Sequence, residues 1–426
     1  MIGSPLTVKA RAYKPGLFPS SINISEIWTD PPSLVGSGTV SDPFRIFNRE
    51  QFCEINANLD SHFKLFANID LSYYQDHTLA VLLPFGKYSG PNASDNRPFT
   101  GSLDGNGHVI YGGQITGTDQ DAKGLFAYCN GAEITDLQVC LDSVQGNSHT
   151  GYLAGVMLDS EVSRCLASGD VISGNGNAGL LIGQAENCII DQCFSIGSVT
   201  GANCNGGLIG KQIEGTVSDS YSLAAVTEAH ISGGLIGSLN GSGLVERCYS
   251  AGLVSGEGTW IGGLVGNGNP EMVTDSFWDM QSSGQTQSAG GTACNTLQMY
   301  TEGTYVNWDL QHIWFPPVSS YNLGYPRLRH NQITVSVEEQ VPSVQLLSFW
   351  PNPFRSDLHI RLDLSRPSRA ELSVFNVRGQ IVKQLLSGPM DSGNHELVWD
   401  GKDEGGIRDA SGIYFIRIKT NGIEQV

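Results

Sequence analysis

Short apolar runs alternate with polar, glycine-rich turns through the middle of the chain, and the pattern recurs at a nearly fixed distance. The phrase "GGLIGKQIEGTVSDSYSLAAVT" (206–227) is followed by "GGLIGSLNGSGLVERCYSAGLVSG" (233–256) and "GGLVGNGNPEMVTDSFWDM" (262–280). The leucine of this phrase recurs at steps of 28, 28, 27, 27 and 29 residues. It stands at Leu125, Leu153, Leu181, Leu208, Leu235 and Leu264. Such self-similarity predicts a repeat protein whose core copies span about 120–280.

The composition of the unit favours strands over helices. Each copy is rich in glycine, serine, valine and isoleucine, and its apolar runs are too short for the periodicity of a helical repeat. Propeller blades need about 40 residues or more, which exceeds the length of this unit. Short strands joined by Gly, Asn or Ser turns fit a β-solenoid, in which equivalent residues of neighbouring coils lie about 4.8 Å apart. We therefore predict an all-β protein with a parallel β-helix of ~28-residue coils, each coil acting as the template for the next.

A column of mostly charged residues stands directly before a Cys/Ser column. It reads Asp136, Arg164, Gln192, Asp219, Arg247 and Asp275. Opposite charges on neighbouring coils favour an outward ladder of ion pairs, each worth about 0–1 kcal/mol where exposed. The alternative is a catalytic cluster of converging carboxylates. The alternation of charge along the column favours the ladder.

An aromatic column directly follows the Cys/Ser column. Phe194, Tyr221, Tyr249 and Phe277 recur at steps of 27, 28 and 28 residues, and Leu166 holds the same place one coil earlier. If the charged column points outward, strand alternation points these rings outward too, and the exposed stack would form a glycan-binding strip. If a bend re-aims the chain, the rings enter the core instead. Both alternatives stay open, and these rings are the candidate glycan contacts.

Segments on both sides of the repeats predict caps for the ends of the stack. "NREQFCEINANL" predicts a short helix with Asn48 as its N-cap and Gln51 completing a capping box. "CNTLQMYTEGTYVNWDL" predicts a second short helix and a tryptophan-rich plug. Residues 1–29 contain two alternating segments, "LTVKARAY" and "INISEIW", which predict strands.

Two resemblances to known families rest on these phrases. "GSGTVSDPFRIFNREQFCEI", "FTGSLDGNGHVI", the Gly-Leu-[Ile/Val]-Gly units and "CYSAGLVSG" look like the GLUG-motif repeat proteins, and residues 34–330 form this part. This resemblance implies a right-handed parallel β-helix on a secreted or surface bacterial protein of adhesin-like type, without shared catalytic residues. "TVKARAYKPG", within residues 1–29, resembles the end of the chitobiase/β-hexosaminidase C-terminal-type domain, which implies a remnant of an upstream domain.

Residues 331–343 predict a linker, and the alternating segments of 344–426 predict a small antiparallel Ig-like β-sandwich. This part resembles the C-terminal sorting domain of type IX secretion cargo and the related Ig-like domain of the flagellar hook-capping protein. The matching phrases contain Pro351, Asn352, Pro353, Phe354, Trp399, Asp400, Gly401, Gly412 and Tyr414. Members of the sorting family usually continue into a last basic strand, so we expect export to require such a strand after Val426.

The charge and composition of the chain limit the classes of partner that it can bind. The chain of 426 residues has a net charge of −18, and residues 124–280 hold 16 Asp and Glu against Arg164, Lys211 and Arg247. Such a surface repels nucleic acid and anionic lipid, and it suits solubility or the collection of calcium. No apolar run reaches 18 residues, so we predict no membrane span. "GNGNAG" (174–179) lacks the following helix of a dinucleotide site, so we expect no cofactor.

The nine cysteines follow no metal-binding spacing, so we expect no metal centre. Cys165, Cys193 and Cys248 share a column with Ser220 and Ser276. A position that accepts serine predicts small buried thiols in place of an obligatory disulfide. The pair Cys165–Cys193 is the best disulfide candidate.

Together these features predict a non-catalytic, monomeric, exported protein of the cell surface or extracellular space, with a signal peptide upstream. Adhesion or glycan binding is its expected work, and its expected partners are a glycan or cell surface and the type IX secretion machinery. The alternative is a β-helix polysaccharide lyase or glycoside hydrolase. Converging carboxylates in a groove would favour that alternative.

Overall fold

The chain divides into two units, Met1–Ile333 and Thr334–Val426, each with its own hydrophobic core. The structure is a computed structural model. It describes residues 6–10, 23–27, 33–72, 82–117, 121–318, 322–330, 344–350, 357–364, 368–376, 381–390, 393–406, 408, 414–420 and 423–425. The expected linker at 331–343 lies outside the described residues.

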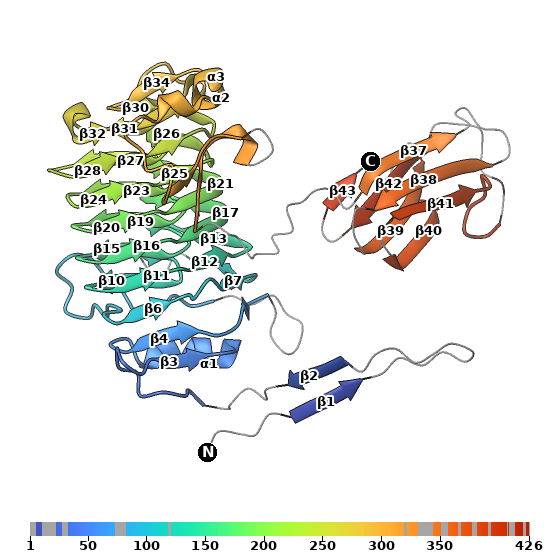
Figure 1. Ribbon diagram of the computed structural model, residues 1–426, viewed down its shortest axis with the longest axis horizontal. Coiled ribbons are helices and arrows are strands. Elements are labelled where there is room, and N and C mark those ends of the chain that lie inside the picture. The colour runs from blue at the N-terminus through green and yellow to red at the C-terminus, as the bar shows by residue number, and fades with distance from the viewer. Residues whose placement is uncertain are drawn as a thin grey trace. The chain divides into compact units, whose positions relative to one another are not determined.

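The repeats form the predicted stack of coils, and each coil contributes strands to parallel sheets that run along the solenoid (Figure 1). The first sheet contains the residue that follows each repeated leucine. Its strands, in order, are β10 (Phe126–Asn130), β15 (Ala154–Leu158), β19 (Ile182–Glu186), β23 (Ile209–Ile213), β27 (Ile236–Asn240) and β31 (Val265–Asn267). Ile182 pairs with Ile209, and Ile209 pairs with Ile236. The coils of about 28 residues predicted from the sequence are therefore the coils of the fold.

A second sheet contains short strands that begin near the N-terminal cap. They are β3 (Phe44–Ile46), β4 (His62–Leu65), β6 (Ser102–Asp104), β11 (Glu133–Thr135), β16 (Glu161–Ser163), β20 (Ile189–Asp191), β24 (Thr216–Ser218), β28 (Leu244–Glu246) and β32 (Val273–Thr274). A third, wider sheet contains the remaining side of each coil. Its strands from the first coils are β5 (Ile69–Asp70), β7 (Val109–Tyr111), β8 (Gln114–Ile115), β9 (Ala122–Lys123), β12 (Gln138–Cys140), β13 (Ser143–Gly146) and β14 (His149–Thr150). The later coils add β17 (Leu166–Ser173), β18 (Asn177–Gly179), β21 (Phe194–Gly201), β22 (Cys204–Gly206), β25 (Tyr221–Ser222), β26 (Ala225–Gly233), β29 (Tyr249–Ser250), β30 (Val254–Gly262), β33 (Phe277–Asp279) and β34 (Thr292–Cys294).

The leucine column fills the interior of the solenoid. Leu208 has no exposed surface, and its equivalents in the other coils are buried as well. The glycine that stands two residues after the leucine is required for a steric reason. A Cβ on Gly210 would lie 2.6 Å from the backbone nitrogen of Ala178 and from the carbonyl oxygen of Gly183. The repeated phrase thus packs one leucine into the core and leaves no room for a side chain at the corner beside it.

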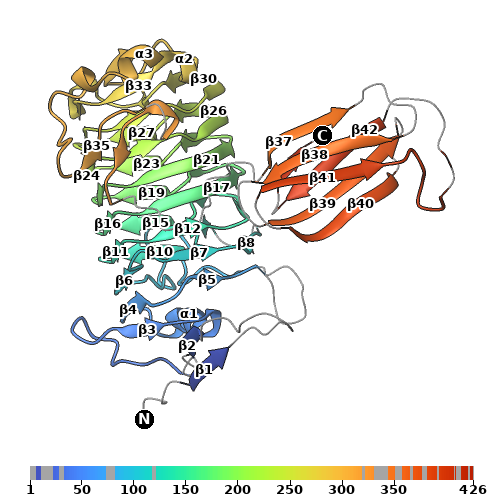
Figure 2. The same cartoon turned by 45° about the vertical axis from the view of Figure 1, so that its right-hand side comes forward.

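The predicted caps are present at both ends of the stack. Helix α1 (Arg49–Cys53) and the 3₁₀ turn η1 (Glu54–Ala57) cover the first coils, and the Asn48 side chain caps α1 by accepting a hydrogen bond from the Gln51 N–H. At the other end lie η2 (Pro270–Met272), α2 (Met280–Ser283) and α3 (Thr296–Met299) (Figure 2). A capping box between Asn295 and Gln298 begins α3. Strands β1 (Leu6–Ala10) and β2 (Asn23–Ile27) form an antiparallel pair, as their alternation predicted.

The second unit consists of two antiparallel sheets. One contains β37 (Val344–Trp350), β38 (Leu358–Leu364) and β41 (Gly393–Trp399). The other contains β40 (Ile381–Met390), β39 (Ser368–Asn376), β42 (Tyr414–Thr420) and β43 (Ile423–Gln425). Side chains from both sheets, among them Ile360 and Leu372, share one core. This arrangement confirms the prediction of small antiparallel sheets near the C-terminus.

The conserved-looking "WDG" phrase of this unit forms a turn around a buried ring. Trp399 is 1% exposed, its indole donates to the Lys402 carbonyl at 2.9 Å, and Tyr414 packs edge-on against it. The Asp400 carboxylate accepts from the Lys402 N–H, and Gly401 has a φ of 72°. Pro351, Asn352, Pro353, Phe354 and Gly412, the other residues of the matching phrases, lie outside the described residues.

All nine cysteines are free thiols. The predicted buried column is confirmed, because Cys165, Cys193 and Cys248 are buried, and the candidate disulfide Cys165–Cys193 is not formed. Burial raises the pKa of the Cys188 thiol to about 11, and it raises the pKa of Cys193 well above the ordinary value. These thiols stay protonated and behave as small apolar side chains.

Replacement of a repeated leucine should destabilise the stack. We expect Leu208→Asp to lower the free energy of unfolding of the first unit by roughly 4 kcal/mol or more, because it buries an unpaired charge. Urea unfolding of the full chain measures this change. The matched control is Leu253→Asp, at a side chain that is 53% exposed in the same stack, and it should change stability by less than about 0.5 kcal/mol. Equal stability of the two variants would contradict the coil register.

Candidate functional site

The charged column lies at a sharp corner between the second and third sheets. All six of its residues have left-handed backbone, with φ between 43° and 53°. Directly after the corner, Ser220 is fully buried inside the coil, and Tyr221 begins the next strand. Strand alternation then turns the aromatic column outward from the coil. Phe194, Tyr221 and Tyr249 accordingly belong to a hydrophobic cluster separate from the solenoid interior.

The rings of this column stack in register. Phe194 pairs with Tyr221 and Tyr221 with Tyr249 along parallel strands. The ring centroids of Phe194 and Tyr221 are 4.8 Å apart, and those of Tyr221 and Tyr249 are 4.9 Å apart with only 5° between the ring planes. Phe277 continues the column and meets Tyr305 edge-on at 5.4 Å. The spacing predicted from the sequence is therefore confirmed.

A C-terminal segment covers the stack. Residues 295–318 and 322–330, called the strap here, run back along the outside of the solenoid from its C-terminal end (orange in Figures 1 and 2). The strap contains α3, η3 (Glu302–Thr304), β35 (Trp314–Phe315), η4 (Asn322–Gly324) and β36 (Arg327–Leu328). β35 and β36 pair with each other as a short antiparallel ribbon. The solenoid is therefore closed on one side by its own chain.

Four strap rings, Tyr305, Trp308, Trp314 and Tyr325, contact the stack. The centroid of Trp314 is 6.0 Å from that of Tyr221 and 6.1 Å from that of Tyr249, and Tyr325 stacks on Tyr249 at 5.8 Å. Trp308 packs against Trp314 at 4.4 Å. As a result Tyr221 is 1% exposed and Tyr249 is not exposed at all. Burial of such rings on both surfaces gives the strap most of its contact with the solenoid.

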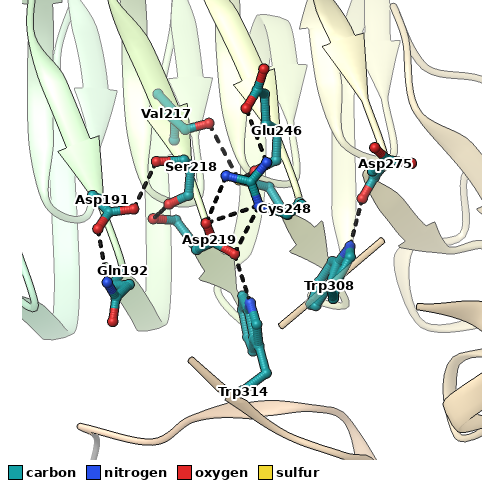
Figure 3. Close-up of polar contacts among 12 residues, drawn as sticks. Asp191, Gln192, Val217, Ser218, Asp219, Glu246, Cys248, Asp275, Trp308 and Trp314 are labelled. Carbon is teal, nitrogen blue, oxygen red and sulfur yellow. Dashed lines mark hydrogen bonds and ion pairs between the residues drawn. The ribbon is translucent and has the colours of Figure 1, made fainter. Parts of the chain in front are cut away.

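Hydrogen bonds fix the strap to the corner residues (Figure 3). The Trp314 indole donates to the Asp219 carboxylate at 2.9 Å, and the Trp308 indole donates to the Asp275 carbonyl at 2.8 Å (Figure 3). Asn307 donates to the Asp275 carboxylate at 2.7 Å. The strap thus binds the same corner position in two coils, with the coil of Arg247 between them.

Two further bonds attach the far part of the strap. The Tyr325 hydroxyl donates to the buried carboxylate of Asp279 at 2.8 Å. The Tyr249 hydroxyl donates to the Pro326 carbonyl at 2.8 Å. The buried phenols of Tyr249 and Tyr325 therefore both have partners, as buried polar groups require.

Two of the ion pairs predicted in the charged column are formed, Arg164 with Asp136 and Arg247 with Asp219, whereas the Asp275 carboxylate accepts from Asn307. Arg164 makes two bonds of 2.7 Å to the carboxylate of Asp136. Arg247 binds the carboxylate of Asp219 and also contacts Glu246 at 3.0 Å. The expectation of a fully exposed ladder is wrong at Asp219, whose side chain is 3% exposed because Trp314 covers it. These carboxylates are engaged in holding corners and strap together, and in this part of the chain they do not converge on an open groove.

The expectation of an exposed glycan strip at Phe194, Tyr221, Tyr249 and Phe277 is wrong, because the strap covers these rings. The rings do point out of the coil, as the first alternative expected, yet three of them are buried and Phe277 is partly buried. The second alternative is also incomplete, since no bend returns them to the solenoid interior. The sequence contained one signal for this outcome. The segment 305–325 lies outside the repeats and is rich in aromatic residues, two of them tryptophans.

The acidic turns between the first and second sheets form a hollow. A cavity of 270 Å³ is lined by residues that include Glu133, Asp159 and Glu161. Among the residues that the structure describes, no group of three or more His, Cys, Asp or Glu side chains is placed to hold a metal ion. The collection of calcium by this acidic surface stays a prediction.

Comparison with known proteins assigns the second unit. Residues 355–422 match the family model of the FlgD Ig-like domain. The second unit therefore contains a FlgD Ig-like domain. No helix within the described ranges has the length and apolar character to cross a membrane.

Two curated proteins are similar to parts of the chain. Over 322 residues it is 35% identical to halomucin of Haloquadratum walsbyi, a match that covers 72% of this chain and 3% of that protein. Over 82 residues it is 34% identical to a putative Gly-rich membrane protein of Evansella cellulosilytica, covering 18% of this chain and 10% of that protein. The chain thus spans at most a tenth of the length of these relatives.

Truncation of the central strap ring should loosen the strap. We expect Trp314→Ala to lower the free energy of unfolding of the first unit by about 3–5 kcal/mol, since it removes a fully buried indole and leaves Asp219 without that donor. Leu297→Ala, at a strap side chain that is 76% exposed, is the control and should have almost no effect. Urea unfolding followed by circular dichroism measures both. A negligible effect of Trp314→Ala would contradict the assignment of the strap as a structural element.

Acid should weaken the end of the strap. Burial, with a smaller contribution from Arg164, lowers the pKa of His330 to about 4. The unfolded chain takes up this proton near pH 6.5, so the folded state loses stability as the pH falls from about 6.5 to about 4 and loses no more below that. We expect His330→Gln to show a shallower loss of stability over this range in thermal unfolding at a series of pH values. The same slope in both proteins would contradict the placement of His330.

Proposed function

We propose that the chain is part of a non-catalytic, exported repeat protein that acts at a bacterial cell surface or outside the cell in adhesion or glycan binding. This proposal rests on one observation, which is that the aromatic and charged columns of the solenoid serve its own packing. The aromatic column packs under the strap, and the corner carboxylates bind Arg164, Arg247 and the Trp314 indole. What remains outside is a rigid, regular, acidic surface, which suits display and contact better than catalysis at those columns.

The likeness to halomucin, of which the match covers 3%, supports a role for the solenoid as one segment of a much longer protein. The GLUG-type phrases of residues 34–330 are consistent with that role. On the same reasoning we take β1 and β2 as the end of an upstream accessory domain of the chitobiase type.

The FlgD Ig-like domain supports a sorting role for the second unit. Type IX sorting domains have the same phrases, from Pro351 to Tyr414, and a sandwich that folds by itself can serve as an address read by the secretion machinery. In this proposal the solenoid is the cargo, and the second unit directs its export and attachment.

Export of the full chain tests the sorting role. The chain, preceded by a signal peptide and followed by one basic strand, is expressed in a host that has a type IX system. We expect it at the cell surface or in the medium, whereas residues 1–333 alone should stay in the periplasm. Protease accessibility on intact cells and fractionation measure the location. Surface delivery of both proteins, or periplasmic retention of both, would contradict the sorting assignment.

A further inference from the structure

The register of the third sheet changes within the pair of strands β26 and β30. β17 and β21 pair without a break over eight residues, from Leu166–Phe194 to Ser173–Gly201. Between β26 and β30 the register shifts twice, since Val226 pairs with Val254, Ala229 with Gly256 and Ile231 with Trp260. β26 therefore has an extra residue before Ala229, and β30 has extra residues before Trp260. Bulges of this kind re-aim side chains and are frequent beside functional sites.

The interruption depends on local backbone features that the other coils lack. Glu228 has a φ of 66° inside β26, away from the corner columns where the other coils use left-handed residues. On β30, a Cβ at Gly258 would lie 1.8 Å from the carbonyl oxygen of His230, and one at Gly256 would lie 2.5 Å from that of Ala229. Glycine is thus required where the bulged strand approaches its neighbour.

The bulge brings a tryptophan to the surface. Trp260 continues a column in which Asn177 and Cys204 are each 7% exposed, yet its own side chain is 55% exposed. It is the largest exposed apolar side chain among the residues described on the coils. A ring exposed to this extent leaves one face accessible to a ligand.

Exposed polar residues stand on both strands of the bulge. Glu228 and His230 on β26, and Glu257 and Thr259 on β30, are all exposed and border the same register shift. A flat indole offers a face to the CH groups of a sugar ring, and carboxylate, imidazole and hydroxyl groups offer acceptors and donors to its hydroxyls. The two glutamates and the acidity of the surrounding coils repel anionic polymers.

We propose that the bulge between β26 and β30 is a binding site for a neutral glycan, with the Trp260 indole as the stacking platform and Glu228, His230 and Glu257 as hydrogen-bonding groups. This site deepens the proposed function, on which it rests, because it names a neutral glycan as the ligand and places the contact away from the strap. In this proposal Trp260, and not the buried aromatic column, is the aromatic contact of the glycan-binding site.

The test uses the full chain on an array of neutral oligosaccharides of glucose, mannose, galactose and N-acetylglucosamine, followed by titration calorimetry with the oligosaccharides that bind. We expect Trp260→Ala to weaken binding by about tenfold or more, as truncation of a central aromatic contact does. Trp260→Phe, which keeps a flat ring, should retain more of the affinity. Leu253→Ala is the matched control, because Leu253 is 53% exposed on the same coil, and it should bind as the parent chain does. Circular dichroism checks that the variants are folded.

The outcomes separate this site from the function on which it rests. Binding that Trp260→Ala leaves unchanged overturns the site while glycan binding itself stands. Absence of binding to every neutral oligosaccharide overturns the site, and adhesion of the full chain to cells then decides the proposed function separately. If the chain instead binds a protein that has no glycan, and Trp260→Ala loses this binding, a glycan is not the ligand. Release of reducing ends from bound oligosaccharide would overturn the non-catalytic function and favour the hydrolase alternative.

Discussion

Every residue of a coil has to fit the same residue of the coils before and after it, about 4.8 Å away. This stacking constraint explains most of the first unit. Leucine at one column fills the interior, glycine two places later leaves space for neighbouring backbone, and a left-handed residue turns each corner. Because no coil buries its own core, a residue that suits one coil suits all, and the sequence repeats for that reason.

Stacking also aligns the side chains that point outward, which creates a problem where these side chains are apolar. A row of outward rings such as Phe194, Tyr221 and Tyr249 would leave a large apolar strip in water. The strap solves it within the same chain, by laying Trp314 and Tyr325 on the rings and by donating hydrogen bonds to corner residues such as Asp219. One long-range contact thereby buries both the aromatic column and part of the charged column. The features of the solenoid that looked most like a site are in this way part of its packing.

Departures from the repeat have a different meaning from the repeat itself. Where β26 and β30 lose their common register, the template no longer dictates the side chain, and Trp260 stands exposed beside charged residues. In the proposed function the coils supply rigidity, and the bulge between β26 and β30 supplies a local surface of its own. The FlgD Ig-like domain is a separate unit with a separate core, so neither task depends on its packing.

The sequence by itself determined whatever the stacking constraint repeats. The coil length, the buried leucines, the column of thiols that includes Cys193, the pairing of Arg164 with Asp136 and the ring spacing all followed from residues recurring at one step. Local signals determined the caps as well, because the Asn48 cap involves residues only a few positions apart. Only the tertiary structure decided that the aromatic column is covered, because Tyr249 and Pro326 lie 77 positions apart and no repeat relates them. The same holds for the burial of Asp219 and for the exposure of Trp260. Each depends on how one particular segment packs against the stack, and no repeated sequence pattern encodes that packing.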